Sequence, residues 1–506
     1  MLDSLNYLAL GMHEAFTVTN IMWVLIGGIL GTVIGMLPGL GPATGVAVLI
    51  PVTYGMNPAT ALITMCGVYY GAMFGGSRAS ILINTPGDAS AIVTCWDGYP
   101  MTRNGQAGKA LAISAWASFI GGMISVIFIV FLALPIAKFA LKFGPAEMFA
   151  LLVFSLTAAV TLSKGNLIKG FIALCVGFII STIGIDAQTG VMRFTMGFVS
   201  LQEGIDFLVA MIGLYAVAEV FKNYSSLNAK YGVSKSDIGK VSMTREDWKR
   251  CIGPILRSSP LGFIVGVLPG MGGTIATLLA YSTEKQISKH PEEFGKGAME
   301  GLAAPEAANN ASSVGAMIPL LTMGIPGSGT TAVMLGALMM LGVQPGPTLF
   351  IQHPEIPWGV IASMIIGNML LLAINLPLVK PLIQLLKIPQ RILMPMIMGL
   401  AFMGTYLMNY SSSDFFLLIL FGIGGYFMLK LDIPIPPMVL ALILGGSLEQ
   451  SFRQALTIGN GTPVLIFTKP ISITLLTIAA LSLVYTLVKD SITKAKISKD
   501  QADKHF

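Results

Sequence analysis

Long charge-free apolar runs dominate the chain. Residues 15–77 contain no Asp, Glu, Lys or Arg, and residues 307–354 are free of these charges over 48 positions. Residues 110–137 form a shorter run of the same kind. A helix that crosses a bilayer needs about 20 mostly apolar residues. Runs of this length therefore predict membrane-spanning helices.

Shorter apolar stretches complete a multi-pass pattern. They lie near residues 148–163, 167–185, 205–221, 357–378, 391–409, 413–430, 434–447 and 464–488. Only helices and closed barrels satisfy their backbone hydrogen bonds in lipid, and stretches of this length favour helices. We expect an all-α polytopic membrane protein with about 11–13 transmembrane segments.

Composition narrows the class of protein further. The apolar residues make up 54% of the 506 residues and the charged residues only 11%, whereas soluble domains carry about 25% charged residues. The mean hydropathy is +0.78. These values exclude a disordered chain, a nucleic-acid-binding protein and almost any cytosolic enzyme, and they make membrane lipid the solvent. The 57 Gly and 28 Pro are too many for straight spans, so we expect broken helices or re-entrant hairpins.

The positions of the basic residues predict the topology. No Lys or Arg precedes Arg78, eight occur from Lys222 to Arg257, and five from Lys489 to Lys504. Short basic loops stay in the cytoplasm. We therefore expect a cytoplasmic connector and a cytoplasmic C-terminus, with the N-terminus outside. The first residues lack the basic region of a cleavable signal peptide.

Two landmarks recur in order along the chain. Leu37-Pro38-Gly39-Leu40-Gly41 returns as Leu268-Pro269-Gly270-Met271-Gly272 at an offset of 231, and Thr85-Pro86-Gly87-Asp88 matches Ile325-Pro326-Gly327-Ser328 at an offset of 240. Between them, Gly71–Ser80 can be laid over Gly301–Asn310 at an offset of 230, with few identities. The pattern indicates a duplication.

The duplication and the charges together predict the domain plan. If the connector is inside and the N-terminus outside, the two repeats enter from opposite faces and are inverted. The plan comprises a periplasmic or interfacial N-terminal segment (1–17), membrane repeat 1 (18–221), a basic connector (222–257), membrane repeat 2 (258–463), a last transmembrane helix (464–488) and a basic tail (489–506).

Inverted repeats with Gly/Pro-broken helices are typical of secondary transporters. Irregular backbone at membrane depth survives only when it is buried in protein or lines a wet cavity. A helix N-terminus there offers free N–H groups that suit a carboxylate, and the carbonyls of a broken turn suit a cation. A break at equivalent positions in each half therefore predicts one shared binding site.

The candidate residues lie at the four breaks and on one polar patch. For substrate binding we expect Asn84, Thr85, Pro86, Gly87, Ser90, Asn309, Asn310, Gly327, Ser328, Gly329, Thr330 and Thr331. For the coupling cation we expect Asp88, Pro38, Gly39, Gly41, Thr44, Pro269, Gly270, Gly272 and Thr274, with Na⁺ the one metal ion considered.

These assignments have structural alternatives. Asp88 is the best charged ligand, but a carboxylate there could instead cap the next helix. The segment Asn84–Ser90 also has the composition of a Pro-Gly turn at a membrane edge. The amides of Asn309 and Asn310 could join helices to one another rather than line a pathway.

Signatures of enzymes are absent from the sequence. Gly324–Thr331 resembles a phosphate-binding loop, but Thr330 stands at the position of its lysine. No HExxH motif occurs, and the four cysteines show no metal-ligand spacing. We therefore expect no catalytic residues and no cofactor. A channel and a polytopic membrane enzyme are the remote alternatives.

With these residues in view, the chain resembles the large membrane subunit of the tripartite tricarboxylate transporters. The features that carry the resemblance cover essentially the whole chain. They are GMLPGLGPATG (Gly35–Gly45), the block from Tyr69 to Ser77, NTPGDA (Asn84–Ala89), DGYPM (Asp97–Met101), and the second-half LPGMG and GIPGSGTTA.

The resemblance implies a bacterial inner-membrane permease of about a dozen helices that is not an enzyme. It implies a small membrane subunit of about four helices and a periplasmic solute-binding protein as partners. Its substrates would be small carboxylates, with tricarboxylates such as citrate as the type case, taken up by cation-coupled alternating access, in an elevator-like form or another. The particular carboxylate, the choice between Na⁺ and H⁺, and the existence of a homodimer stay open.

Overall fold

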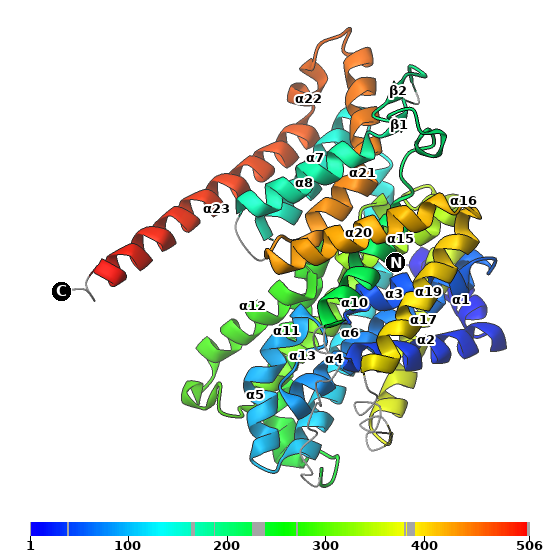
Figure 1. Cartoon of the computed structure of the whole chain (residues 1–506). Helices are drawn as coiled ribbons and strands as arrows, with labels where there is room; N and C mark the ends of the chain where they lie inside the picture. The colour runs from blue at the N-terminus through cyan, green and yellow to red at the C-terminus, as the bar shows by residue number, and fades with distance from the viewer. Residues whose placement is uncertain are drawn as a thin grey trace. The chain divides into compact units, whose positions relative to one another are not determined.

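The described part of the chain is almost entirely helical (Figure 1). The computed structural model describes residues 2–37, 40–162, 167–186, 188–224, 238–269, 272–378, 381 and 390–502. Within them the strands form one two-stranded antiparallel sheet, β1 (Gly184–Ile185) with β2 (Met192–Arg193). The all-α class is confirmed.

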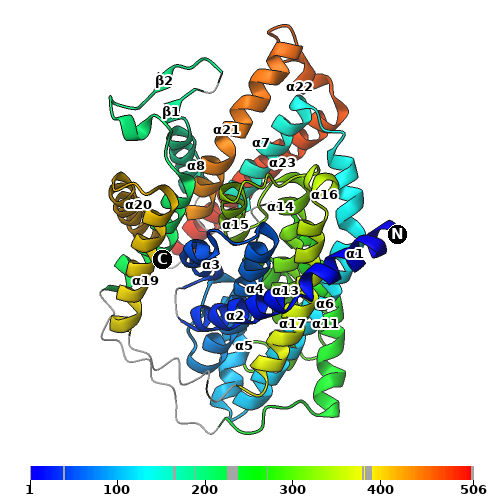
Figure 2. The same ribbon diagram turned by 90° about the vertical axis from the view of Figure 1, so that its right-hand side faces the viewer.

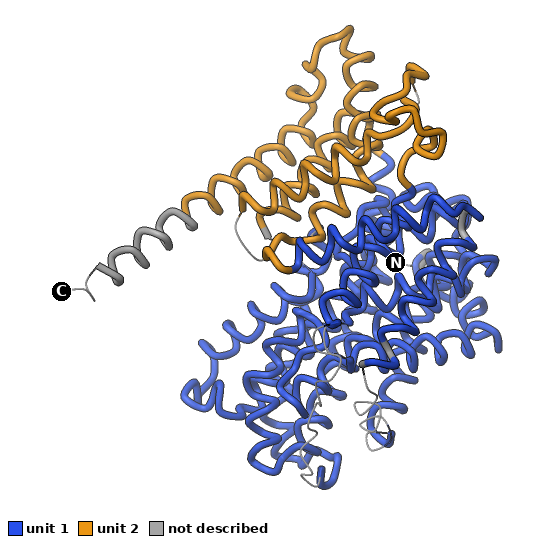
Figure 3. Tube along the Cα trace, viewed as in Figure 1, with its two compact units in different colours: residues 1–141, 206–429 blue, residues 142–205, 430–506 orange. Residues whose placement is uncertain are grey.

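The chain divides into two compact units, coloured separately in Figure 3. Unit 1 comprises residues 1–141 and 206–429, and unit 2 comprises residues 142–205 and 430–506. Each unit therefore takes segments from both halves of the sequence. This division groups helices by contact, and the repeat boundaries expected from the sequence stay a prediction.

Unit 1 holds most of the helices. They are α1 (Leu2–Ala15), α2 (Val18–Met36), α3 (Pro42–Thr53), α4 (Pro58–Ile83), η1 (Ala89–Ala91), α5 (Ile92–Arg103), α6 (Ala107–Ala140), α9 (Phe207–Met211), the π-helix η3 (Ile212–Val217), α10 (Ala218–Asn223), α11 (Arg245–Val267), α12 (Gly272–Ile287), η5 (Pro291–Glu293), α13 (Met299–Gly315), α14 (Met317–Met323), α15 (Gly329–Met340), α16 (Leu349–Gln352), α17 (Glu355–Asn375), α19 (Gln390–Asn409) and α20 (Ser413–Lys430).

Unit 2 is smaller. It contains α7 (Pro145–Leu162), α8 (Leu167–Ser181), the sheet, η2 (Val199–Leu201), α21 (Ile435–Ile458), α22 (Val464–Thr468) and α23 (Pro470–Ala502). The helix α21 packs against both α7 and α8, and α23 packs against α7.

Six described helices are long and apolar enough to cross a bilayer. They are α2, α6, α17, α20, α21 and the Pro470–Val488 part of α23. Five shorter apolar helical stretches accompany them. This pattern is that of a multi-pass membrane protein, as the sequence predicted, and the expected total of 11–13 segments stays a prediction.

The predicted interruptions are real helix ends. The helix α4 ends at Asn84 and α14 ends at Gly324, both in the left-handed conformation, with φ of 54° and 69°. Each is followed by a proline, Pro86 or Pro326, that cannot continue a helix. The other two interruptions separate α2 from α3 and α11 from α12. Pro38, Gly39 and Gly270 lie outside the described residues.

Close glycine contacts establish how the two halves correspond. The helix α2 packs against α4 where Gly31 faces the backbone of Val68, and α11 packs against α13 where Gly262 faces the backbone of Ala308. In Figure 2, α2 and α4 lie next to each other. A Cβ at either glycine would collide with the facing carbonyl, so only glycine permits this approach.

These contacts correct one part of the sequence comparison. The glycines are related by the offset of 231, but the facing residues Val68 and Ala308 are related by 240. The offset of 230 expected for Gly71–Ser80 is therefore wrong. The nine additional residues fall before α13, and small residues that repeat at helical spacing made the shorter offset look acceptable.

The helix α13 lies at the centre of unit 1. All its residues from Glu300 to Gly315 are buried, and it packs against α6, α11 and α12. Gly121 of α6 faces the backbone of Ala307, which lets the two helices approach closely. A helix buried on every side must satisfy its polar side chains within the protein.

The second part of the expected connector is helical. Thr244 and Asp247 form a capping box that begins α11. The Oδ1 of Asp247 also forms an ion pair with the Nζ of Lys109, at 3.0 Å. Arg257 pairs with Glu284 at 2.5 Å. The part of the expected connector from residue 245 to residue 257 therefore belongs to α11. Residues 225–237 of the connector lie outside the described part of the chain.

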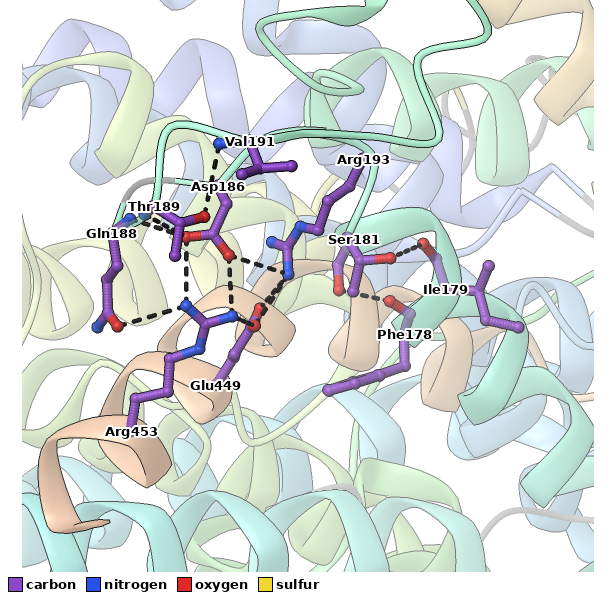
Figure 4. Close-up of polar contacts among 11 residues, drawn as sticks. Phe178, Ile179, Ser181, Asp186, Gln188, Thr189, Val191, Arg193, Glu449 and Arg453 are labelled. Atoms are coloured by element: carbon purple, nitrogen blue, oxygen red, sulfur yellow. Dashed lines mark hydrogen bonds and ion pairs between the residues drawn. The ribbon is translucent and has the colours of Figure 1, made fainter. Parts of the chain in front are cut away.

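An ionic cluster joins the sheet of unit 2 to α21 (Figure 4). Arg453 contacts Asp186 at 2.8 Å and Glu449 at 2.5 Å, and Arg193 contacts the same carboxylates at 3.3 and 2.9 Å. Asp186 also accepts the N–H groups of Gln188 and Thr189. These bonds, with those from Arg453, hold the pKa of Asp186 below its usual range.

Candidate functional site

A tyrosine of α4 lies between the two Pro-Gly breaks. The hydroxyl oxygen of Tyr69 is 3.3 Å from that of Ser328, which begins α15. The carboxylate of Asp88, which precedes η1, is close enough to act electrostatically on the same phenol. The structure thus brings the break of repeat 1 and the break of repeat 2 to one side chain.

The break between α2 and α3 joins this group at Asp88. Ser90 donates a hydrogen bond to the Asp88 carboxylate, with its hydroxyl 2.9 Å from each oxygen. A Cβ on Gly41 would lie 3.2 Å from the Cβ of Asp88. Two of the residues expected at a cation site, Gly41 and Asp88, therefore lie side by side.

The break between α11 and α12 contacts the break between α4 and η1 at Gly273. A Cβ there would lie 2.7 Å from the Oδ1 of Asn309 and 3.0 Å from the Cβ of Ser90. Correspondingly, α12 packs against η1. The start of α12, the polar patch of α13 and the start of η1 thus meet, although they come from both halves of the chain.

The break between α14 and α15 contacts the break between α2 and α3 through Tyr215, a residue that the sequence analysis did not single out. Tyr215 lies in the π-helix η3, a helix type often found at functional sites. Its carbonyl accepts a bond from Thr44 at 3.4 Å, and a Cβ on Gly329 would lie 2.9 Å from its hydroxyl. The helices α3 and α15 also pack together.

Several polar atoms around these breaks are buried without a hydrogen-bond partner among the described residues. They are the hydroxyls of Tyr70 and Tyr215, both side-chain amide atoms of Asn309, and the side-chain oxygen of Asn310. An unpaired buried polar group costs about 1–3 kcal/mol. The unpaired atoms of Asn309 and Tyr215 lie beside Gly273 and Gly329, and such groups suit a site that exchanges water for a polar ligand.

Some of the predicted residues end or begin helices. Ser328 and Thr331 form a capping box, with the Ser328 N–H 2.8 Å from the Thr331 Oγ1. Asn84 is exposed, and the Thr85 hydroxyl donates to the carbonyl of Ile83 at 3.1 Å. Thr330 is buried beside the capping pair, with 4% of its surface exposed.

The remaining predicted residues shape the breaks through their backbone. A Cβ on Gly87 would lie 2.7 Å from the Cα of Gly76, and one on Gly327 would lie 2.8 Å from the Cα of Ala316. Gly272 has a φ of +56° at the start of α12. Thr274 offers its carbonyl to the hydroxyl of Thr277, and Pro86 and Pro269 precede their helices as expected.

The arrangement offers donors to an anion and oxygens to a cation. The helices α12 and α15 both begin in this region, and helix N-termini favour negative charge. Asp88 supplies one negative charge beside them. Sequence reasoning missed Tyr69, Tyr70 and Tyr215, and the one available signal was the Tyr-Tyr pair inside a charge-free run.

Comparison with known proteins agrees with this picture. Residues 21–440 match the model of the tripartite tricarboxylate transporter TctA family. An uncharacterized 52.8 kDa protein in the TAR-I ttuC' 3' region of Agrobacterium vitis is 42% identical over 489 residues, which are 96% of this chain and 97% of that protein.

A second protein of Agrobacterium vitis, uncharacterized and in the TAR-II ttuC' 3' region, is 41% identical over 227 residues. These cover 45% of this chain and 94% of that protein. No solved structure matches the chain. The family match and the first relative each extend over most of the sequence, and on this ground the chain belongs to the tripartite tricarboxylate transporter TctA family.

Proposed function

We propose that this chain is the permease subunit that imports tricarboxylates such as citrate across the bacterial inner membrane. The observation that carries the proposal is the meeting of four helix breaks beside buried polar atoms that have no hydrogen-bond partner among the described residues. Membership of a tripartite transporter family supports it. The Asn309 amide, the tyrosine hydroxyls and the N–H groups at the start of α15 hold the carboxylate oxygens.

The uptake is coupled to a cation, Na⁺ or H⁺, that moves with the substrate. Asp88 is the carboxylate of this site, and its position beside Gly41 supports that role. A substrate with several negative charges crosses the bilayer interior only with compensating positive charge. The two inverted repeats then alternate access to the site, in an elevator-like movement or another one.

The permease works with two partners. A periplasmic solute-binding protein delivers the substrate, and a small membrane subunit of about four helices completes the carrier. The basic residues of the connector (222–257) and of the C-terminal tail support a cytoplasmic location for these two segments of the permease. A homodimer is compatible with this arrangement.

Uptake of labelled citrate into proteoliposomes tests the proposal. The vesicles contain the permease and its two partners, and a Na⁺ or H⁺ gradient is imposed. We expect gradient-dependent accumulation that Asp88→Asn and Thr330→Val reduce at least tenfold. Equal uptake by both variants and the wild type would remove the site assignment.

Two alternatives make different predictions in the same vesicles. A carrier of another small organic acid would show the same gradient dependence with a different labelled acid. A channel would let citrate equilibrate without counterflow, whereas a carrier preloaded with unlabelled citrate accumulates label. The concentration of polar groups at helix breaks favours the carrier.

A further inference from the structure

A carboxylate deep inside unit 1 plays no part in the site described above. Glu306 of α13 has no exposed surface. Its Oε1 accepts the hydroxyl of Thr94 at 2.5 Å, and its Oε2 accepts the hydroxyls of Ser114 at 2.8 Å and Ser118 at 3.1 Å. Three helices, α13, α5 and α6, thus direct oxygen atoms to one buried point.

These hydroxyls differ from many others in the helices of unit 1. A serine or threonine inside a helix commonly bonds back to a carbonyl of its own preceding turn. Ser80 and Thr322 do so, with bonds to Gly76 and Ile318. The hydroxyls of Thr94, Ser114 and Ser118 turn away from their own helices and toward Glu306, which indicates a built site rather than incidental burial.

The carboxyl group of Glu306 has no positively charged partner in the described part of the chain. No Lys, Arg or His of that part forms an ion pair with Glu306. Arg78, the buried cation of α4, donates instead to the backbone carbonyl of Asn375 at the end of α17. The titratable group that interacts with Glu306 from a neighbouring helix is the thiol of Cys95 on α5.

A buried ionised carboxylate without a countercharge is strongly destabilising. One carboxylate balances one positive charge, and hydroxyl and carboxylate oxygens are hard ligands that suit alkali and alkaline-earth cations rather than soft metals. We propose that Glu306, Thr94, Ser114 and Ser118 form a Na⁺ site, separate from Asp88. As a coupling site it rests on the proposed function.

The position of this site explains how Na⁺ and substrate affect each other. Glu306 precedes Asn309 by about one helical turn on α13, and Thr94 of α5 lies four residues after Ser90 of η1. Asn309 and Ser90 both contact the position of Gly273. A cation that draws α5 toward α13 therefore also positions the polar groups of the substrate site.

Thermal unfolding of the purified permease in detergent tests the proposal without any transport. Choline is replaced by Na⁺ at constant ionic strength. We expect saturating Na⁺ to raise the unfolding midpoint by roughly 5 °C, and we expect Glu306→Gln and Thr94→Val to abolish this shift. Thr94→Ser retains the hydroxyl and keeps it. Ser125→Ala on the same face of α6 is the matched control and also keeps it.

Three results would overturn the assignment. They are an unchanged Na⁺ shift in Glu306→Gln, an equal shift with K⁺, and a stability that follows pH rather than Na⁺ and loses that dependence in Glu306→Gln, which would make Glu306 a proton site. A failure of citrate uptake with the Na⁺ shift intact would instead count against the proposed substrate, so the two proposals fail separately.

Discussion

The hydroxyl oxygen of Tyr69 lies 3.3 Å from the hydroxyl oxygen of Ser328, although the two residues belong to different halves of the duplicated chain. The pair spans the space between the Pro-Gly break of repeat 1 and that of repeat 2. A movement of either break relative to α4 must change this contact. The distance between these two hydroxyl oxygens therefore depends directly on the geometry of the candidate site.

Replacement of this tyrosine tests whether its hydroxyl binds substrate. Tyr69→Phe removes one hydrogen bond and leaves the ring packing, so we expect the KM for citrate uptake to rise about 2–10-fold. Tyr485→Phe, at a side chain that is 67% exposed, is the control. An unchanged KM for Tyr69→Phe would assign its hydroxyl to helix packing alone.

Asn309 separates a binding role from a structural one. Its amide atoms are buried without described partners, so Asn309→Ala removes a destabilising group and should leave the thermal midpoint unchanged or higher. Citrate uptake should fall at least tenfold. Asn6→Ala, at an exposed position of α1, should change neither quantity. Loss of stability together with uptake would show that the amide holds the helices together.

Replacement of Gly327 tests the close packing of the break between α14 and α15. A Cβ there would lie 2.8–2.9 Å from three atoms of Ala316 and Gly266, so Gly327→Ala should lower the stability by about 1–3 kcal/mol. Gly424→Ala on α20 meets no atom within 4 Å and should be neutral or stabilising. Thermal unfolding of both variants in detergent makes the comparison. A stable Gly327→Ala would mean that the break can widen freely.

Asp97 explains why the DGYPM segment begins with an acidic residue. Its Oδ1 accepts the backbone N–H groups of Gly295, Gly297 and Ala298, each at 2.8 Å. Asp97→Ala leaves these donors without an acceptor, so their amides should exchange with deuterium at least tenfold faster. Asp432→Ala, in the turn before α21, serves as the control. Unchanged exchange would show that the loop is held by other contacts.

Asp186 predicts an acid-sensitive stability. Its pKa is lowered first by the backbone N–H of Thr189, then by that of Gln188 and by Arg453. A lowered pKa in the folded state stabilises the fold above the usual aspartate range and less as the pH falls through and below it. The wild type should therefore exceed Asp186→Asn in thermal stability at pH 7, and the difference should begin to narrow as the pH is lowered to 3 and narrow further in stronger acid. A constant difference over this range would contradict the assigned pKa direction.

The helix breaks could be predicted because they depend on local chemistry. Pro86 and Pro326 cannot donate a helical hydrogen bond, and the preceding Asn84 and Gly324 adopt the left-handed conformation that ends a helix. These properties belong to the residues themselves. The same holds for the apolar runs that identify a membrane protein.

The partners of the site could not be predicted in this way. Tyr215 and Thr44 are 171 residues apart, and Glu306 and Thr94 are 212 apart. Thr44 was among the expected residues, but a tyrosine or a threonine in an apolar run is usually a core or interface residue, so the sequence did not indicate its partner Tyr215 or the pairing of Glu306 with Thr94. The offset of 230 was wrong because small residues at helical spacing can be matched in more than one register, and the sequence alone does not say which register the helices use.

The sequence by itself determined that this chain is a duplicated, helical membrane protein whose helices break at Gly/Pro positions, because hydropathy and backbone freedom act over a few neighbouring residues. The tertiary structure alone decided which breaks meet, which polar atoms of Asn309 and Tyr215 lack a partner among the described residues, and which hydroxyls surround Glu306. Those features depend on the register in which glycine-lined helices pack, and that register is a property of pairs of distant segments rather than of either segment alone.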